Sequence, residues 1–63
     1  MKTITFYRKA WNADDEECVL PIYTITVESN IPNEDAVIFA IEKFEEWGNV
    51  SDWADLAEWY GIA

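Results

Sequence analysis

Carboxylates are the only side chains in this sequence that are numerous enough to define a functional surface. The chain has 13 Asp and Glu residues, four Lys and Arg residues and no histidine, so its formal net charge is -9. It also lacks a second cysteine and a Gly-rich phosphate loop, which removes the usual bases, nucleophile pairs and nucleotide cradles. A carboxylate pair such as Glu42 and Glu46 would need a pocket that makes one residue an acid and the other a base, and a small core encloses few pockets. We therefore expect a binding protein and not an enzyme.

The acids are concentrated in the C-terminal half of the chain. Residues 28–63 carry nine acids and one cation, Lys43, whereas residues 1–27 have a net charge of only -1. Several acids stand at helical spacing, where like charges destabilise a helix by about 0.2–0.5 kcal/mol per pair. A helix adapted only for solubility would interleave more Lys or Arg. The expected partner-binding face comprises Glu34, Asp35, Glu42, Glu45, Glu46, Asp52, Asp55 and Glu58.

This face has two interpretations. A Lys- or Arg-lined groove of a basic protein would attract it over long range, as such a groove attracts a nucleic-acid backbone. Alternatively, the face is a highly charged solubilising surface, for example in a salt-adapted organism. The same charge argues against binding to anionic lipids and against direct binding to nucleic acid.

The four tryptophans and the cysteine are assigned by their neighbours in the sequence. Trp47 and Trp59 adjoin the acids of the expected face and are either core residues or aromatic anchors of an interface, since Trp is enriched at hot spots. Trp53 is expected in the core, and the position of Trp11 stays open. Cys18 is expected to be a small buried hydrophobic residue.

A second cluster of acids, Asp14, Asp15, Glu16 and Glu17, invites comparison with a calcium loop. The EF-hand loop requires a central Gly and a Glu at its twelfth position, and the sequence has neither. No Cys/His cluster has zinc-ligand spacing. We expect a solvated turn that forms a secondary acidic patch, with no metal and no cofactor.

The N-terminal half of the chain reads as strands. Residues 2–8 alternate with period two and are rich in β-branched and aromatic residues, and the polar stretch 12–17 predicts a reversal. A second strand is predicted over residues 18–28, with Val19, Tyr23, Ile25 and Val27 on one face. Pro21 is expected at an edge, a bend or a break, because it lacks a backbone donor.

The C-terminal half reads as two helices. The first is predicted from about 33 to 47, with an apolar stripe of Val37, Ala40, Ile41 and Phe44 and with Gly48 as its C-terminal cap. The second is predicted to begin after Ser51 and to end at Gly61. It would carry Trp53, Leu56, Ala57 and Tyr60 on one side and a row of Asp52, Asp55 and Glu58.

These elements predict one α+β domain over residues 1–63: a small antiparallel β-sheet of two or three strands, followed by two helices packed on it. The third strand would lie within residues 10–21. Neither a signal peptide nor an apolar run of about 20 residues is found, so we expect a cytoplasmic protein. A single cysteine, which cannot form an internal disulfide, fits a reducing compartment.

In overall character the chain resembles the small phage-encoded anti-CRISPR and anti-restriction proteins, several of which mimic double-stranded DNA. The resemblance rests on the short, acidic, His-free sequence, its α+β pattern and the aromatic residues among its acids, with no specific motif. It implies host-defence evasion in a bacterial cell. The acidic face would block target-DNA binding by a CRISPR surveillance complex, with a type I complex as the first candidate.

Two alternatives remain open. In the first, the chain inhibits another basic nucleic-acid enzyme, such as a restriction, nuclease or repair enzyme, as an inhibitor or antitoxin. In the second, it is a small self-associating structural domain. A net charge of -9 on 7.3 kDa favours a monomer or small dimer.

Overall fold

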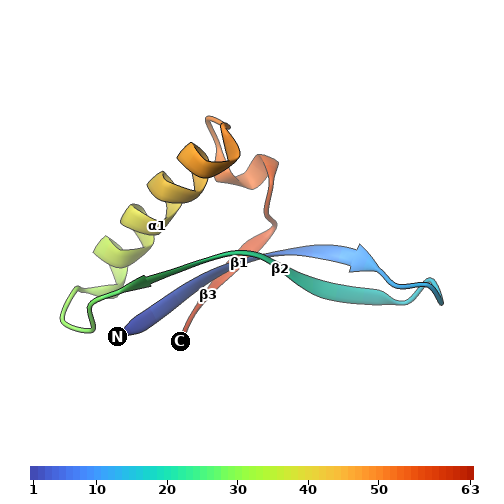
Figure 1. The fold of residues 1–63 in the computed structure, drawn as a ribbon, viewed down its shortest axis with the longest axis horizontal. Coiled ribbons are helices and arrows are strands. Elements are labelled where there is room, and N and C mark those ends of the chain that lie inside the picture. Colours follow the sequence, from blue (N-terminus) through green and yellow to red (C-terminus); the bar gives the residue numbers. More distant parts are fainter.

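The computed structural model describes all 63 residues as a three-stranded antiparallel sheet with one helix on one of its faces (Figure 1). The sheet order is β2-β1-β3, so the N-terminal strand is central. This confirms the α+β class, but only one α-helix is present where two were predicted. The elements are β1 (Lys2–Trp11), β2 (Glu17–Val27), α1 (Asn33–Gly48), a 3-10 turn η1 (Trp53–Asp55) and β3 (Trp59–Ile62).

The core lies between β1 and α1. Alternation along β1 turns Ile4 and Phe6 towards the helix, and the helix contributes Ala36, Ala40 and Phe44 at four-residue spacing. All five side chains have 0% relative exposure. The rings of Phe6 and Phe44 stack with centroids 4.3 Å apart and form the centre of the core. Small alanines on the helix let its backbone approach the sheet closely.

The predicted apolar stripe of α1 is nearly correct but is rotated. Ala40 and Phe44 are buried as expected, and Ala36 joins them, whereas Val37 and Ile41 are only half-buried. The centre of the inward face is therefore an i, i+4, i+8 row. The predicted bounds of 33–47 agree with the observed helix to within one residue.

A β-bulge in β2 changes which side chains share a face. Tyr7 of β1 is opposite Pro21 and the preceding residue is opposite Tyr23, so Ile22 is left over. One extra residue moves every side chain beyond it to the other face, because the side-chain period of a strand is two. Val19 therefore lies on the side of the sheet away from the helix, and its predicted grouping with Tyr23 is wrong. Pro21 lies on an edge strand, as predicted.

Beyond Tyr7 the sheet narrows to a two-stranded arm. Residues 8–11 of β1 pair only with residues 17–20 of β2, and the hairpin projects far beyond the helix (Figure 1). We call residues 8–20 the arm. The molecule measures 42 × 25 × 14 Å, and every arm residue except Ala10 is exposed. The sheet has the third strand that was held possible, but this strand is β3 and does not lie within residues 10–21, which form the ends of β1 and β2 and the turn between them.

The predicted second helix is wrong. The carboxylate of Asp52 accepts a hydrogen bond of 3.1 Å from the Ala54 N–H, and this cap supports only the single turn η1. The chain then becomes extended, and β3 pairs with residues 4–7 of β1. Without β3, one edge of the central strand would have unpaired backbone groups next to the core, which is costly. This tertiary requirement overrides the weak helical pattern.

The C-terminal end of α1 also differs from expectation. Asn49, rather than Gly48, adopts the left-handed conformation, with φ 55°, and its N–H bonds to the carbonyl oxygens of the last turn. Asparagine tolerates this conformation better than other residues that have a Cβ. At Gly48 a Cβ would overlap the end of the Leu56 side chain, so a larger residue there would require that side chain to move.

Candidate functional site: the acidic face of the helix

Five acids share the solvent side of α1, opposite its buried alanine and phenylalanine row. At 100° per residue they fall within an arc of about 120° that is centred opposite the buried row. Four are exposed and Glu45 is half-buried. We call this set the acidic helix face, and its members are Glu34, Asp35, Glu42, Glu45 and Glu46.

The acidic helix face carries a dense line of charge. Twelve residues separate Glu34 from Glu46, so the acids span about 18 Å of helix axis, on average about one charge per 4 Å, with a gap of about 10 Å between Asp35 and Glu42. One strand of B-DNA carries about one charge per 3.4 Å. The only cation on α1 is Lys43, whose Nζ lies 3.9 Å from Oε2 of Glu46 and 5.7 Å from the centroid of the Phe39 ring. It lies at the margin of the face and leaves the line of acids intact.

Sequence reasoning missed one residue of this surface. Ile38 falls inside the acidic arc, between Asp35 and Glu42, and is 64% exposed. The available signal was an isoleucine on the polar side of an amphipathic helix. An apolar side chain surrounded by acids gives the surface a contact that excludes water, in addition to its charge.

Glu45 has a structural role within the face. Its Oε2 accepts a 2.8 Å hydrogen bond from the backbone N–H of Trp53, which is part-buried. The bond ties the last turns of α1 to η1 and satisfies the first donor of that turn. Glu45 therefore contributes charge to the surface and holds the C-terminal segment against the helix.

The C-terminal acids do not form the expected row, because their segment is not a helix. Asp52 caps η1, Asp55 is an exposed residue of that turn, and Glu58 precedes β3. Spacing of three aligns side chains only on a helix. The structure therefore does not extend the acidic helix face with a second parallel line of acids.

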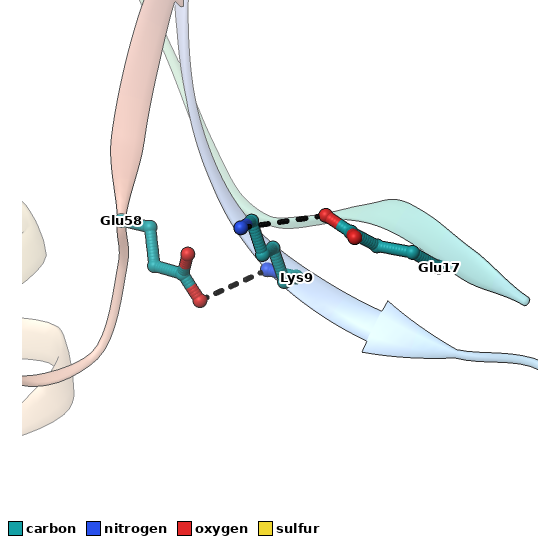
Figure 2. A network of polar contacts seen from close by, with 3 residues as sticks. All are labelled: Lys9, Glu17 and Glu58. Atoms are coloured by element: carbon teal, nitrogen blue, oxygen red, sulfur yellow. Dashed lines mark hydrogen bonds and ion pairs between the residues drawn. The ribbon is translucent and has the colours of Figure 1, made fainter.

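Glu58 instead contacts the start of the arm (Figure 2). Its Oε1 accepts a 3.3 Å hydrogen bond from the Lys9 backbone N–H, while the Lys9 ammonium lies 3.4 Å from Oε1 of Glu17. Thr3 exchanges both backbone bonds with Ala63, so odd-numbered residues of β1 direct their N–H groups towards β3. Lys9 is the first residue of β1 beyond the end of β3 whose N–H points to this side, and the Glu58 carboxylate accepts the hydrogen bond from it.

The secondary acidic patch lies at the tip of the arm, well away from α1 (Figure 1). The Asn12 side chain holds the turn: its Oδ1 accepts from the N–H groups of Asp14, at 2.9 Å, and Glu16, at 3.0 Å. Asp15 adopts φ 63°, which Asp tolerates better than most residues. No group of three or more potential metal ligands is close enough together to hold a metal ion.

Neither tryptophan proposed as an anchor lies in the acidic helix face. Trp47 is 60% exposed in the last turn of α1, on the side of the buried row, and packs against Tyr23, with ring centroids 5.0 Å apart. Trp59 is half-buried and stacks on Tyr7 at 6.3 Å, on the side of the sheet away from the helix. Cys18 is exposed on the arm, so its expected burial is wrong.

The surface has one concave feature, an open hollow of about 290 Å³ near the start of α1. Its one ionisable side chain is that of Glu28, and its other walls are largely apolar. A single carboxylate next to apolar walls offers no acid–base pair. The lining residues are Met1, Thr26, Val27, Glu28, Ile31 and Phe39.

Comparisons with models of protein families, with curated proteins and with solved structures found no match. Separately, α1 is too short and too polar to cross a membrane, and the structure contains no helix that is long and apolar enough to do so.

Proposed function

We propose that the protein is an acidic mimic of double-stranded DNA that occupies the basic nucleic-acid-binding surface of a partner protein. The observation that carries this proposal is the line of five acids on α1, whose mean charge spacing of about 4 Å is close to that of one DNA strand. The line is rigid because it is built on a helix whose opposite side is the core. A rigid line pays little conformational entropy on binding.

The helix tolerates repulsion between neighbouring carboxylates that substitution would relieve. Glu42 faces Glu45 at i+3 and Glu46 at i+4, and each such pair costs about 0.2–0.5 kcal/mol. Ile38 stands exposed among these acids and has no role in the core. In the proposed interface, this side chain would add an apolar contact among the charged ones.

The target class that we propose first is a CRISPR surveillance complex of type I, blocked at its target-DNA channel without any chemistry. Such a channel is lined by basic residues that hold a nucleic-acid backbone. The support for this target is the resemblance in size, charge and α+β pattern to phage anti-CRISPR proteins. The same acidic helix face would also fit a restriction, nuclease or repair enzyme, so the target must be found by experiment.

The test is a competition assay with the purified protein. Duplex DNA is bound to CRISPR surveillance complexes and, in parallel, to a panel of restriction enzymes, nucleases and repair enzymes, at two salt concentrations. We expect displacement from a surveillance complex that weakens steeply at the higher salt, because charged contacts dominate. Displacement from another panel member alone would identify that enzyme as the target in place of a surveillance complex. Displacement from none would refute the proposal that the protein mimics DNA.

A further inference from the structure

We propose that two copies of this chain pack face to face through the side of the sheet that α1 leaves bare. In Figure 1 the helix covers one side of the sheet and no element covers the other. Because Ile4 and Phe6 face the helix and side chains alternate along a strand, the bare side of β1 carries Thr3, Thr5, Tyr7, Lys9 and Trp11. We call this surface the bare sheet face. This inference is independent of the proposed DNA mimicry.

The bare sheet face has an aromatic and apolar centre. Tyr7 and Trp59 are opposite each other on β1 and β3, and their rings stack at 6.3 Å with an interplanar angle of 21°. Pro21 lies opposite Tyr7 on the other neighbouring strand. On the arm the surface continues through Val19, which is 55% exposed, and Trp11, which is 63% exposed. Tyr7 and Trp59 are half-buried and Pro21 is exposed, so this face leaves aromatic and apolar surface open to a partner.

Charge indicates that the occupant is a second copy. The bare sheet face carries one cation and one anion, Lys9 and Glu17, which neutralise each other at 3.4 Å, although the whole chain has a net charge of -9. A basic partner would be drawn to the acids of α1 and not to this neutral surface. A second copy presents the same neutral surface and keeps its own acidic helix face on the far side. In a dimer with a two-fold axis, the two bare sheet faces are buried against each other and both acidic helix faces stay exposed on the outside.

The edges of the sheet are less suitable for self-association than its face. The outer edge of β2 is interrupted by Pro21 and the adjoining bulge, which are two common devices against edge pairing. The free edge of β1 is occupied at Lys9 by the Glu58 carboxylate. The outer edge of β3 is only four residues long. Two copies therefore meet through the bare sheet face and not through a continuous sheet.

The size of the surface predicts a weak dimer. Ten residues of β1 extend about 33 Å, and two to three strands are about 10–14 Å wide, so the flat area is roughly 400 Å² per copy. The pair would bury roughly 800 Å², which is below the roughly 1,200 Å² at which stable interfaces begin and is the size of a weak, transient contact. We expect a reversible, concentration-dependent dimer in which the sheets lie about 10 Å apart.

Two neighbouring positions on β2 provide a matched test. Val19 is opposite Lys9 on the bare sheet face, and Leu20 is opposite Arg8 on the other side of the arm. Both side chains are exposed, at 55% and 46%. Val19→Lys and Leu20→Lys therefore make the same charge change, each opposite an existing cation, and differ only in the face that they alter.

Sedimentation equilibrium over a range of protein concentrations measures the association. We expect the wild type to dimerise, Val19→Lys to raise the dissociation constant at least about tenfold, and Leu20→Lys to leave it nearly unchanged. The reason is that a charge placed without a partner in an interface loses its hydration. A wild type that stays monomeric at its highest soluble concentration, or two variants with equal effects, would overturn the proposal.

An independent readout protects the test if Val19→Lys unfolds. Dilution of the isotope-labelled wild type should shift the NMR signals of Thr5, Tyr7 and Trp59 and should leave the exposed residues of α1 unchanged. Shifts confined to Trp47 and Phe39 of α1 would place the contact on the helix side of the molecule and would refute the bare sheet face as the interface.

Discussion

Removal of the Glu45 carboxylate should destabilise the protein, although five like charges on α1 repel one another. The carboxylate accepts a part-buried 2.8 Å hydrogen bond from the Trp53 N–H. Hydrogen bonds to charged groups contribute about 1.5–3 kcal/mol, and the half-buried position of Glu45 argues for the lower end, about 1.5 kcal/mol. A 63-residue domain has about 3–9 kcal/mol of stability in total, so the loss is a large fraction. We expect Glu45→Ala to lower the Tm by about 6–12 °C.

Thermal unfolding followed by circular dichroism measures this effect, and Glu42→Ala is the matched control. Glu42 lies on the same face of the same helix and is exposed, so its removal relieves repulsion without the loss of a cap. Relief of its two like-charge pairs, at about 0.2–0.5 kcal/mol each, should leave its Tm unchanged or raise it by up to about 8 °C. Glu45→Gln keeps an oxygen acceptor without the charge and should fall between the two. Equal Tm values for Glu45→Ala and Glu42→Ala would refute the structural role of Glu45.

Two further substitutions test the core and the arm. Phe44→Ala removes a fully buried ring that stacks on Phe6, and its expected cost of about 3–5 kcal/mol should leave the chain largely unfolded by circular dichroism, whereas Phe44→Leu should remain folded. Asn12→Ala removes the acceptor for two N–H groups at the tip of the arm, so amide exchange at Asp14 and Glu16 should accelerate, while Asn12→Asp should keep the wild-type rates.

The parts of the fold that were predictable have strong local patterns. The helix shows apolar positions at helical spacing between Pro32 and Asn49, and its bounds are predicted to within one residue. The alternation that begins at Lys2 predicts the central strand, although the strand continues to Trp11. In both cases local preference and tertiary packing favour the same structure.

The parts that failed depend on tertiary contacts. The segment from Ser51 to Gly61 has a helical cap and helical spacing, but the unpaired edge of β1 selects a strand for its last residues. The bulge at Ile22 leaves only a weak trace in the sequence, the neighbouring Pro21, and it reverses the face of Val19. Pattern analysis of one segment contains no information about which edge of a sheet needs a partner.

The candidate site likewise has a part that the sequence predicted and a part that it did not. The acids of α1 were placed on one surface by helical periodicity alone, and the structure keeps them together. The acids after Ser51 were expected to extend that surface, but Asp52 caps η1 and Glu58 bonds to the backbone of Lys9. Their roles depend on long-range pairing. The exposure of Ile38 was not predicted, because an isoleucine in an amphipathic helix is usually part of its buried side.

The central claim is that the acidic helix face, and not the net charge of the protein, displaces DNA from a basic partner. The most direct measurement compares two double variants that each remove two charges: Glu42→Gln with Glu46→Gln on the helix, and Asp14→Asn with Glu16→Gln at the tip of the arm. The readout is the inhibition constant for displacement of duplex DNA from the target that the competition panel identifies. All four side chains are exposed.

At about 1 kcal/mol or more for each lost charge contact, the helix variant should inhibit about 30-fold less well, whereas the arm variant should stay within about threefold of the wild type. Equal weakening of the two variants would mean that only net charge matters and would contradict the account. An unaffected helix variant would exclude the acidic helix face as the binding surface.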